Sequence, residues 1–194
     1  MSDSMGNLID GDQLLFLIVQ NYLKKNKLTG GVVGTLMTNL ALEEYLKKEN
    51  IPFKRSDVGD RYVAKMLYDE GWLLGGENSG HILITDKHTT GDGIISALQV
   101  LNSIVEHKTT IEKALKVIPM YPQILINIPL TKKIDLKSKE INEAIEQAKL
   151  IMENKGRILI RESGTQPLIR VMTEGPDKEK ATMAANFLTT KLKF

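Results

Sequence analysis

The sequence has no cysteine and only three histidines among its 194 residues. Without cysteine the chain can form neither a disulfide nor a thiolate metal site, and it has no cysteine nucleophile. The histidines, His81, His88 and His107, do not have the spacing that places two ligands on one helix face. We therefore expect no zinc site in this chain.

Long apolar runs and an excess of charge are also missing. The longest apolar run, residues 14–19, is too short to cross a bilayer, and no segment resembles a secretion signal. The 26 basic and 24 acidic residues are interspersed and leave a net charge of only +2, which gives no electrostatic footprint for nucleic acid. We expect a cytoplasmic protein that binds neither membranes nor nucleic acid.

The first part of the chain alternates short apolar strands with amphipathic helices. Helices are expected at about 14–27, 38–49, 60–70 and 92–106, with strands at 31–33, after Pro52, and on both sides of 76–81. Such alternation predicts a three-layer α/β domain over residues 10–117. Asp10 or Asp12 could suggest a magnesium ligand, but both precede an apolar helix, and helix capping is the favoured interpretation.

Two prolines, Pro119 and Pro122, indicate a domain boundary. Beyond them we expect a strand at 124–130, a helix at 138–154, paired strands at 157–162 and 168–174, and a last helix at 178–192. This order predicts a small two-layer α+β domain over residues 122–194. Residues 1–9 are interpreted as the tail of a preceding domain or as a leader.

A polar loop separates the two paired strands of the second domain. Its candidate ligands are Arg161, Ser163, Gly164, Thr165 and Arg170. Guanidinium groups match phosphate oxygens in bidentate pairs, and a glycine-containing turn can point several backbone N–H groups at one anion. A hairpin turn with two solvated arginines explains the spacing equally well. The loop alone therefore does not distinguish a phosphate site from a simple turn.

A second polar loop lies in the first domain, between apolar segments. It contains Glu77, Asn78, Ser79, Gly80 and His81, whose carboxylate, amide and hydroxyl groups suit sugar hydroxyls. His81 is interpreted as an orienting group rather than a general acid or base. One loop for a phosphate and one for a polyol together favour a phosphosugar ligand.

Two further turns are weaker candidates. Thr35 follows a predicted strand and could offer backbone N–H groups to an anion. Asp60 and Arg61 stand at the start of a predicted helix, where Asp60 as N-cap and Arg61 as a surface residue are a sufficient structural explanation.

The motifs GENSGH and RESGTQPLIRVM resemble those of the alpha-D-phosphohexomutase superfamily, and VGTLMTN, VGDRYV and TTGDG narrow the resemblance to its phosphoglucosamine mutase branch. The resemblance implies an enzyme that interconverts glucosamine 6-phosphate and glucosamine 1-phosphate for UDP-N-acetylglucosamine and cell-wall synthesis. It also implies that this chain comprises the third and fourth domains. The phosphoserine motif and the DGDGD loop that binds Mg²⁺ would then belong to missing N-terminal domains, and the fragment would be inactive alone.

The resemblance also implies roles for individual residues. Glu77 and Ser79 would hold sugar hydroxyls, and Asn78, Gly80 and His81 would shape their loop. The 161–170 loop would grip the phosphate that is not reacting in a hexose bisphosphate intermediate, while Thr35, Asp60 and Arg61 would face the active site. Gln166 departs from the glutamate usual in the family. The alternatives are a phosphomannomutase or phosphoglucomutase, and a non-catalytic phosphosugar-binding module.

Overall fold

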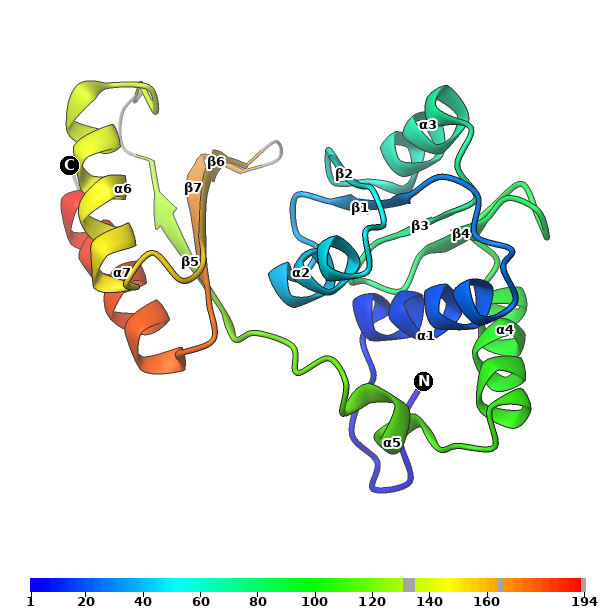
Figure 1. Cartoon of the computed structure of the whole chain (residues 1–194). Helices are drawn as coiled ribbons and strands as arrows, with labels where there is room; N and C mark the ends of the chain where they lie inside the picture. The colour runs from blue at the N-terminus through cyan, green and yellow to red at the C-terminus, as the bar shows by residue number, and fades with distance from the viewer. Residues whose placement is uncertain (131–134, 164–165, 193–194) are drawn as a thin grey trace. The chain divides into compact units, whose positions relative to one another are not determined.

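The structure is a computed structural model that describes residues 1–130, 135–163 and 166–192 (Figure 1). The chain divides into two compact units, Met1–Met120 and Tyr121–Phe194. Each unit has a sheet of its own. Among the described residues, no helix is both long enough and apolar enough to cross a membrane.

The first unit is built on a four-stranded sheet with the order β2-β1-β3-β4. Strands β1 (Val32–Thr35), β2 (Phe53–Ser56) and β3 (Leu74–Gly76) are parallel, and β4 (Ile82–Ile84) runs antiparallel to β3. Because the carboxyl ends of parallel strands share one edge of a sheet, the loops after β1, β2 and β3 emerge at the same edge.

Helices cover both faces of this sheet. Helix α3 (Asp60–Glu70) lies on one face, and α1 (Gly11–Lys24) and α2 (Leu40–Lys48) lie on the other (Figure 1). Helix α4 (Gly93–Glu106) packs against α1 and β4, and the short α5 (Ile111–Leu115) follows it. The core under α3 is formed by Val33, Val63, Leu67 and Leu83.

Helix α1 shows how the local sequence sets an element in place. Asp10 accepts a hydrogen bond from the backbone N–H of Gln13, and the Gln13 side chain returns one to the Asp10 N–H, which makes a complete capping box. The apolar run that follows is almost completely buried. The prediction that an aspartate caps this helix is therefore confirmed, with Asp10 as the cap.

The second unit has two layers. Strands β5 (Gln123–Pro129), β6 (Arg157–Glu162) and β7 (Leu168–Glu174) form an antiparallel sheet with the order β5-β7-β6. Helices α6 (Lys139–Ile151) and α7 (Lys178–Lys191) pack together on one face of the sheet, where their apolar residues enclose Ile169 and Val171 (Figure 1). The prediction of a mixed α/β chain is confirmed.

Candidate functional site

Two loops at the carboxyl edge of the first sheet are joined by a buried carboxylate. Glu77 follows β3 and is only 8% exposed. Its Oε1 accepts a hydrogen bond of 2.8 Å from the backbone N–H of Gly59, which precedes α3. One carboxylate oxygen therefore fixes the loop that follows β2, and Glu77 combines a structural role with its predicted place in a sugar site.

The Glu77–His81 loop is packed against the start of α1. The Gly11 N–H donates to the Asn78 carbonyl oxygen, and a Cβ added at Gly11 would lie 2.0 Å from the Glu77 carbonyl oxygen. Within the loop, the Glu77 N–H donates to the His81 carbonyl, and the Gly80 N–H donates to the Glu77 carbonyl. Ser79 and His81 remain exposed at the tip, 3.5 Å apart between Oγ and Nδ1. The backbone is thus fixed while the polar tip stays accessible.

The prediction that Asp60 is the N-cap of its helix is wrong. The N-cap is Gly59, whose φ of 129° lies in a region that an L-residue rarely adopts, and no side chain caps α3. Asp60 is instead the first helical residue, and its Oδ1 accepts from the Arg61 N–H. Arg61 lies over the ring of Tyr62 and donates to its hydroxyl. Asp60 and Arg61 are both exposed beside the Glu77 tie.

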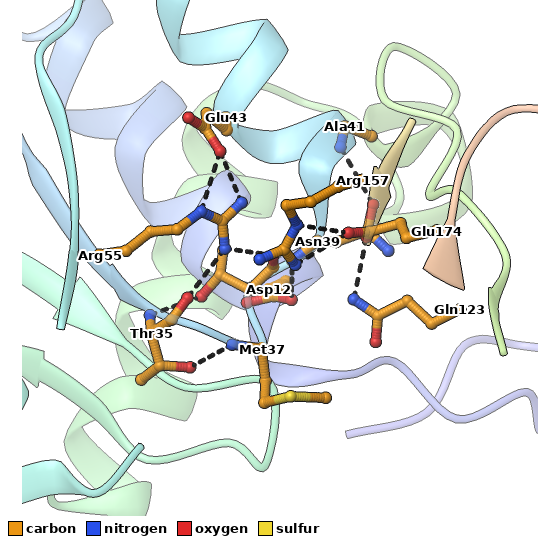
Figure 2. Close-up of polar contacts among 11 residues, drawn as sticks. Asp12, Thr35, Met37, Asn39, Ala41, Glu43, Arg55, Gln123, Arg157 and Glu174 are labelled. Carbon is orange, nitrogen blue, oxygen red and sulfur yellow. Dashed lines mark hydrogen bonds and ion pairs between the residues drawn. The ribbon is translucent and has the colours of Figure 1, made fainter. Parts of the chain in front are cut away.

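Thr35 lies at the same edge, but its side chain is buried and serves its own turn. Its Oγ1 accepts from the Met37 N–H, and its N–H donates to the Thr38 Oγ1. Arg55 on the neighbouring strand β2 also stabilises this turn. Its Nη1 donates to the carbonyl oxygens of Thr35 and Thr38, at 2.8 and 2.7 Å (Figure 2). The Thr35 side chain is therefore a turn-forming group in this structure, and its backbone remains the candidate contact.

Two carboxylates complete the support of the turn. Glu43 on α2 accepts from Nε and Nη2 of Arg55 through its Oε2, which orients the guanidinium (Figure 2). Asp12, which is 1% exposed, accepts the Asn39 N–H at 2.8 Å through Oδ2. The turn after β1 is thus held by charged groups from α1, α2 and β2.

In the second unit, the two predicted arginines face each other. Arg161 on β6 and Arg170 on β7 are direct cross-strand partners. Arg170 Nε is buried and has no hydrogen-bond partner among the described residues, and Asn127 stands opposite Arg170 on β5. Like charges placed directly opposite each other destabilise a strand pair, and an anion between them would remove that cost and satisfy the buried donor.

The loop that joins these strands is described in part. The Ser163 N–H donates to the Leu168 carbonyl oxygen, which closes the hairpin beyond the arginine pair. Gln166 is exposed. Two of the predicted phosphate ligands, Gly164 and Thr165, lie outside the described residues. Of the five predicted ligands, the structure therefore brings together Arg161 and Arg170, with Ser163 two residues beyond Arg161.

The same strand face carries a buried ion pair. Glu174 is completely buried and accepts two hydrogen bonds from Arg157 through Oε2, at 3.1 Å from Nε and 2.9 Å from Nη2 (Figure 2). Its Oε1 accepts from Gln123 at 2.9 Å. Because Arg157 and Arg161 are four residues apart on one strand, both point to the face away from the helices. Arg157 is already satisfied by Glu174, in contrast to Arg170.

The described residues contain no group of three or more His, Cys, Asp or Glu side chains arranged to hold a metal ion. Asp10 is occupied by its capping box, and burial raises the pKa of its carboxyl although the Gln13 N–H opposes that shift.

Comparison with known proteins decides the family. The model for phosphoglucomutase/phosphomannomutase alpha/beta/alpha domain III matches residues 10–121, and the model for the C-terminal domain of the same family matches residues 125–190. The chain belongs to the phosphoglucomutase/phosphomannomutase family. The sequence-based resemblance to phosphohexomutases is confirmed, and the chain corresponds to their third and C-terminal domains.

Curated relatives carry a more specific name. A phosphoglucosamine mutase of Methylobacillus flagellatus is 52% identical over 179 residues, which are 92% of this chain and 40% of that protein. One of Glaesserella parasuis is 47% identical over 194 residues, which are all of this chain and 44% of that protein. This phosphohexomutase chain thus spans less than half the length of the relatives it matches.

Solved structures share the fold. An N-acetylglucosamine-phosphate mutase of the alpha-D-phosphohexomutase superfamily, in its product complex, superimposes with a TM-score of 0.76 at 18% identity, covering 99% of this chain and 46% of that one. The Aspergillus fumigatus N-acetylphosphoglucosamine mutase, in complex with GlcNAc-6P and magnesium, gives a TM-score of 0.74 at 20% identity, covering 97% and 48%.

Sequence reasoning missed the residues that support these loops. Arg55 is the clearest case, because nothing near it in the sequence indicates that its guanidinium reaches the carbonyl groups of Thr35 and Thr38. The hydrogen bond between the Gly59 N–H and the Glu77 carboxylate joins residues 18 positions apart, and it could not be predicted from the sequence either. One signal was available for the pair Arg161 and Arg170: predicted neighbouring strands, each with an arginine close to their shared turn.

Proposed function

We propose that this chain is the sugar- and phosphate-binding portion of a phosphoglucosamine mutase, an isomerase that interconverts glucosamine 6-phosphate and glucosamine 1-phosphate. The observation that carries the proposal is the identity of 47–52% with phosphoglucosamine mutases across both units. The chain spans only 40–44% of those relatives, and the proposed activity therefore belongs to a full-length protein that also has the first two domains.

The phosphate of the bound sugar is assigned to the second unit. Arg161 and Arg170 supply two guanidinium groups on neighbouring strands, and the buried Nε of Arg170 is a donor that a phosphate oxygen would satisfy. Ser163, Gly164 and Thr165 complete this proposed subsite. Its role is to hold the phosphate that is not reacting, so that binding energy away from the reacting bond contributes to catalysis.

The sugar is assigned to the loop after β3. Glu77, Asn78, Ser79, Gly80 and His81 are its proposed contacts, and the exposed Ser79 and His81 offer polar atoms at the tip of a fixed backbone. A fixed loop suits an intermediate that must turn around, because the same donors and acceptors meet the sugar in both orientations. Thr35, Asp60 and Arg61 are proposed to face the same site.

We assign the phosphoserine and the Mg²⁺ of the reaction to the full-length enzyme and not to this chain. When bound there, Mg²⁺ would neutralise charge on the phosphoryl group that is transferred. A hexose bisphosphate is the proposed intermediate. The proposed cellular setting is the cytoplasm, and the proposed product serves UDP-N-acetylglucosamine and cell-wall synthesis.

Phosphate binding can be tested on the 194-residue chain itself by nuclear magnetic resonance. Inorganic phosphate should shift backbone signals of residues 161–170, whereas glucosamine 6-phosphate should shift these and also signals of residues 76–81. Arg170→Met should abolish the response of the 161–170 segment, while Lys139→Ala, a change of an exposed cation on α6, should leave it intact. Equal responses in both variants would rule out the arginine pair as the anion site.

The substrate can be tested in a full-length protein that joins the first two domains of the Methylobacillus flagellatus relative to this chain. Turnover of glucosamine 6-phosphate should exceed that of glucose 6-phosphate and mannose 6-phosphate. Faster turnover of a plain hexose phosphate would favour the phosphoglucomutase or phosphomannomutase alternative. Sugar phosphate binding without turnover of any of the three would favour a non-catalytic binding module.

A further inference from the structure

The loop between β2 and α3 ends on a carboxylate that has no counter-charge. Asp60 is exposed, and no described residue forms an ion pair with it. Its Oδ1 accepts a hydrogen bond of 2.7 Å from the Arg61 N–H, and no described residue donates to its Oδ2. Asp60 therefore presents a carboxylate oxygen to a ligand.

The neighbouring guanidinium group is directed elsewhere. Its central carbon, on Arg61, lies 4.5 Å from the centre of the Tyr62 ring, and Nη2 donates to the Tyr62 hydroxyl at 2.6 Å. These two contacts combine a cation–π interaction with a hydrogen bond. Arg61 thus leaves the carboxylate of Asp60 without an ion pair, although the two residues are adjacent in the sequence.

The other cations of β2 and α3 are already paired with carboxylates. The pairs are Lys54 with Glu70, Arg55 with Glu43, and Lys65 with Asp69. Asp57, at the start of the loop, is exposed and forms no ion pair with a described residue. Asp57 and Asp60 therefore leave the loop with uncompensated negative charge, which attracts a cationic group.

A buried carboxylate places this loop beside the proposed sugar contacts. Glu77, only 8% exposed, accepts the Gly59 N–H through Oε1 at 2.8 Å, and no described residue donates to its Oε2. Gly59 directly precedes Asp60, and its φ of 129° sets the direction in which α3 begins. Asp60 therefore lies one residue from the hydrogen bond that joins its loop to the loop after β3.

We propose that Asp60 is a specificity-determining residue that binds the ammonium group at C2 of the amino sugar. That ammonium is the only cationic group of a glucosamine phosphate, and a hydroxyl replaces it in glucose and mannose phosphates. A hydrogen bond from an ammonium to a carboxylate is charge-assisted and stronger than one from a hydroxyl. The inference rests on the proposed function and deepens it, because it names the group by which this site distinguishes an amino sugar from a plain hexose.

The contact belongs to one orientation of the sugar. Because the proposed intermediate turns around, C2 lies at different places in the two orientations, and Asp60 meets the ammonium in one of them. The loss of Asp60 should therefore affect at least one of the two glucosamine monophosphates, and both have to be measured.

Calorimetric titration of the 194-residue chain tests the inference without turnover. Wild type and Asp60→Asn are titrated with the 6-phosphates and the 1-phosphates of glucosamine and glucose. Asparagine removes the charge but keeps an Oδ1 that can accept the Arg61 N–H. Asp60→Asn should weaken binding of at least one glucosamine phosphate about tenfold more than binding of the matching glucose phosphate.

The outcomes of this titration separate the inference from the proposed function. A preference for both glucosamine phosphates that survives in Asp60→Asn would overturn the inference, and so would a wild-type chain that prefers neither of them. In both cases the proposed phosphosugar site would stand. Failure of the wild-type chain to bind any of the four sugar phosphates would refute that site itself, and the inference with it.

Asp69→Asn is the matched control for charge. It removes one carboxylate from the other end of α3, where Asp69 pairs with Lys65. The ratio of the affinities for glucosamine and glucose phosphates should keep its wild-type value in this variant. An equal loss of preference in Asp69→Asn and Asp60→Asn would show a general effect of charge and would contradict a contact at Asp60.

Turnover in the full-length protein that carries the first two domains of the Methylobacillus flagellatus relative gives a second test. Asp60→Asn should lower kcat/KM for glucosamine 6-phosphate about tenfold more than kcat/KM for glucose 6-phosphate. N-acetylglucosamine 6-phosphate, whose nitrogen is uncharged, should lose no more than glucose 6-phosphate. A purely structural role would lower kcat/KM for all three sugars to the same extent, and that result would overturn the inference.

Discussion

At the scale of single residues, His107 links protonation to stability. It ends α4, and its Nε2 is buried without a hydrogen-bond partner among the described residues. Burial lowers the pKa of His107, and Lys24 and Lys25 add to the shift while Glu106 opposes it. The folded state thus favours the neutral imidazole over the imidazolium more than the unfolded chain does.

The sign of the pH effect follows from the lowered pKa. The unfolded chain takes up a proton near the ordinary value of 6.5, whereas the folded chain resists it. The contribution of His107 to stability is therefore complete above pH 6.5 and is lost as the pH falls toward the lower value of the folded state.

We predict that His107→Gln makes the free energy of unfolding of the first unit less dependent on pH between 7 and 5. Urea titrations followed by the fluorescence of Trp72, the single tryptophan, would measure it. His88→Gln, at an exposed histidine of the same unit, should retain the wild-type dependence. A His107→Gln profile parallel to wild type would refute the assignment.

At the scale of elements, two glycines form a matched pair. Gly11 and Gly93 are each the first residue of a helix, and each follows a capping aspartate, Asp10 or Asp92. A Cβ on Gly11 would collide with the Glu77 carbonyl oxygen and the Gly80 backbone, whereas a Cβ on Gly93 would meet nothing within 4 Å. The sequence context is the same, but only one of the two helix starts packs against a loop.

We predict that Gly11→Ala destabilises the first unit by about 1–3 kcal/mol, as expected for overpacking. It should also shift the Glu77–His81 loop and weaken glucosamine 6-phosphate binding. Gly93→Ala should instead stabilise by about 0.4–1 kcal/mol, because alanine restricts the unfolded chain without strain in the helix. Chemical denaturation of both variants measures the difference. Similar effects from the two changes would show that α1 does not constrain the loop.

The turn after β1 depends on an arginine from the neighbouring strand. We predict that Arg55→Ala speeds hydrogen exchange of the Met37 and Thr38 amides and destabilises the unit by about 1–3 kcal/mol, since two carbonyl groups lose a charged donor. Lys54→Ala is the control, because the half-exposed ion pair of Lys54 with Glu70 should contribute at most about 1 kcal/mol. Unchanged exchange of these amides in Arg55→Ala would show that Arg55 does not stabilise the turn after β1.

The elements that could be predicted from the sequence are those with local signals. Asp10, Asp92, Ser138 and Asp177 each cap the helix that follows, and strands such as Arg157–Glu162 are marked by apolar residues. The five-residue α5 was missed because it is too short to show a period. The α3 cap was misassigned because the chain uses the positive φ of Gly59, and an adjacent aspartate gives the same sequence signal.

What the sequence could not supply is the set of contacts between distant residues. Glu77 was identified as a polar candidate, but its hydrogen bond to Gly59 depends on two parallel strands ending at one edge. The direct opposition of Arg161 and Arg170 likewise depends on the register of β6 and β7, which a shift of one residue would abolish. The sequence motifs identified the candidate residues, but only the pairing of the strands shows which of them lie together.

At the scale of the whole molecule, each unit has a core of its own. Leu42 on α2 is completely buried in the first unit, and Ile169 on β7 is completely buried in the second, among residues of α6, α7 and the sheet. No disulfide joins the units, since the chain has no cysteine. Two separate cores predict two units that open independently.

We predict that Ile169→Ala and Leu42→Ala each lower the stability of one unit only. Each change leaves a cavity in a core and should cost about 2–5 kcal/mol, but the loss should stay within the core that was altered. In native-state hydrogen exchange, Ile169→Ala should speed exchange in β5, β6 and β7 and leave β1 and β3 unchanged, and Leu42→Ala should do the reverse. If either variant sped exchange in both sheets to the same extent, the two units would unfold as one cooperative body, which would contradict the prediction.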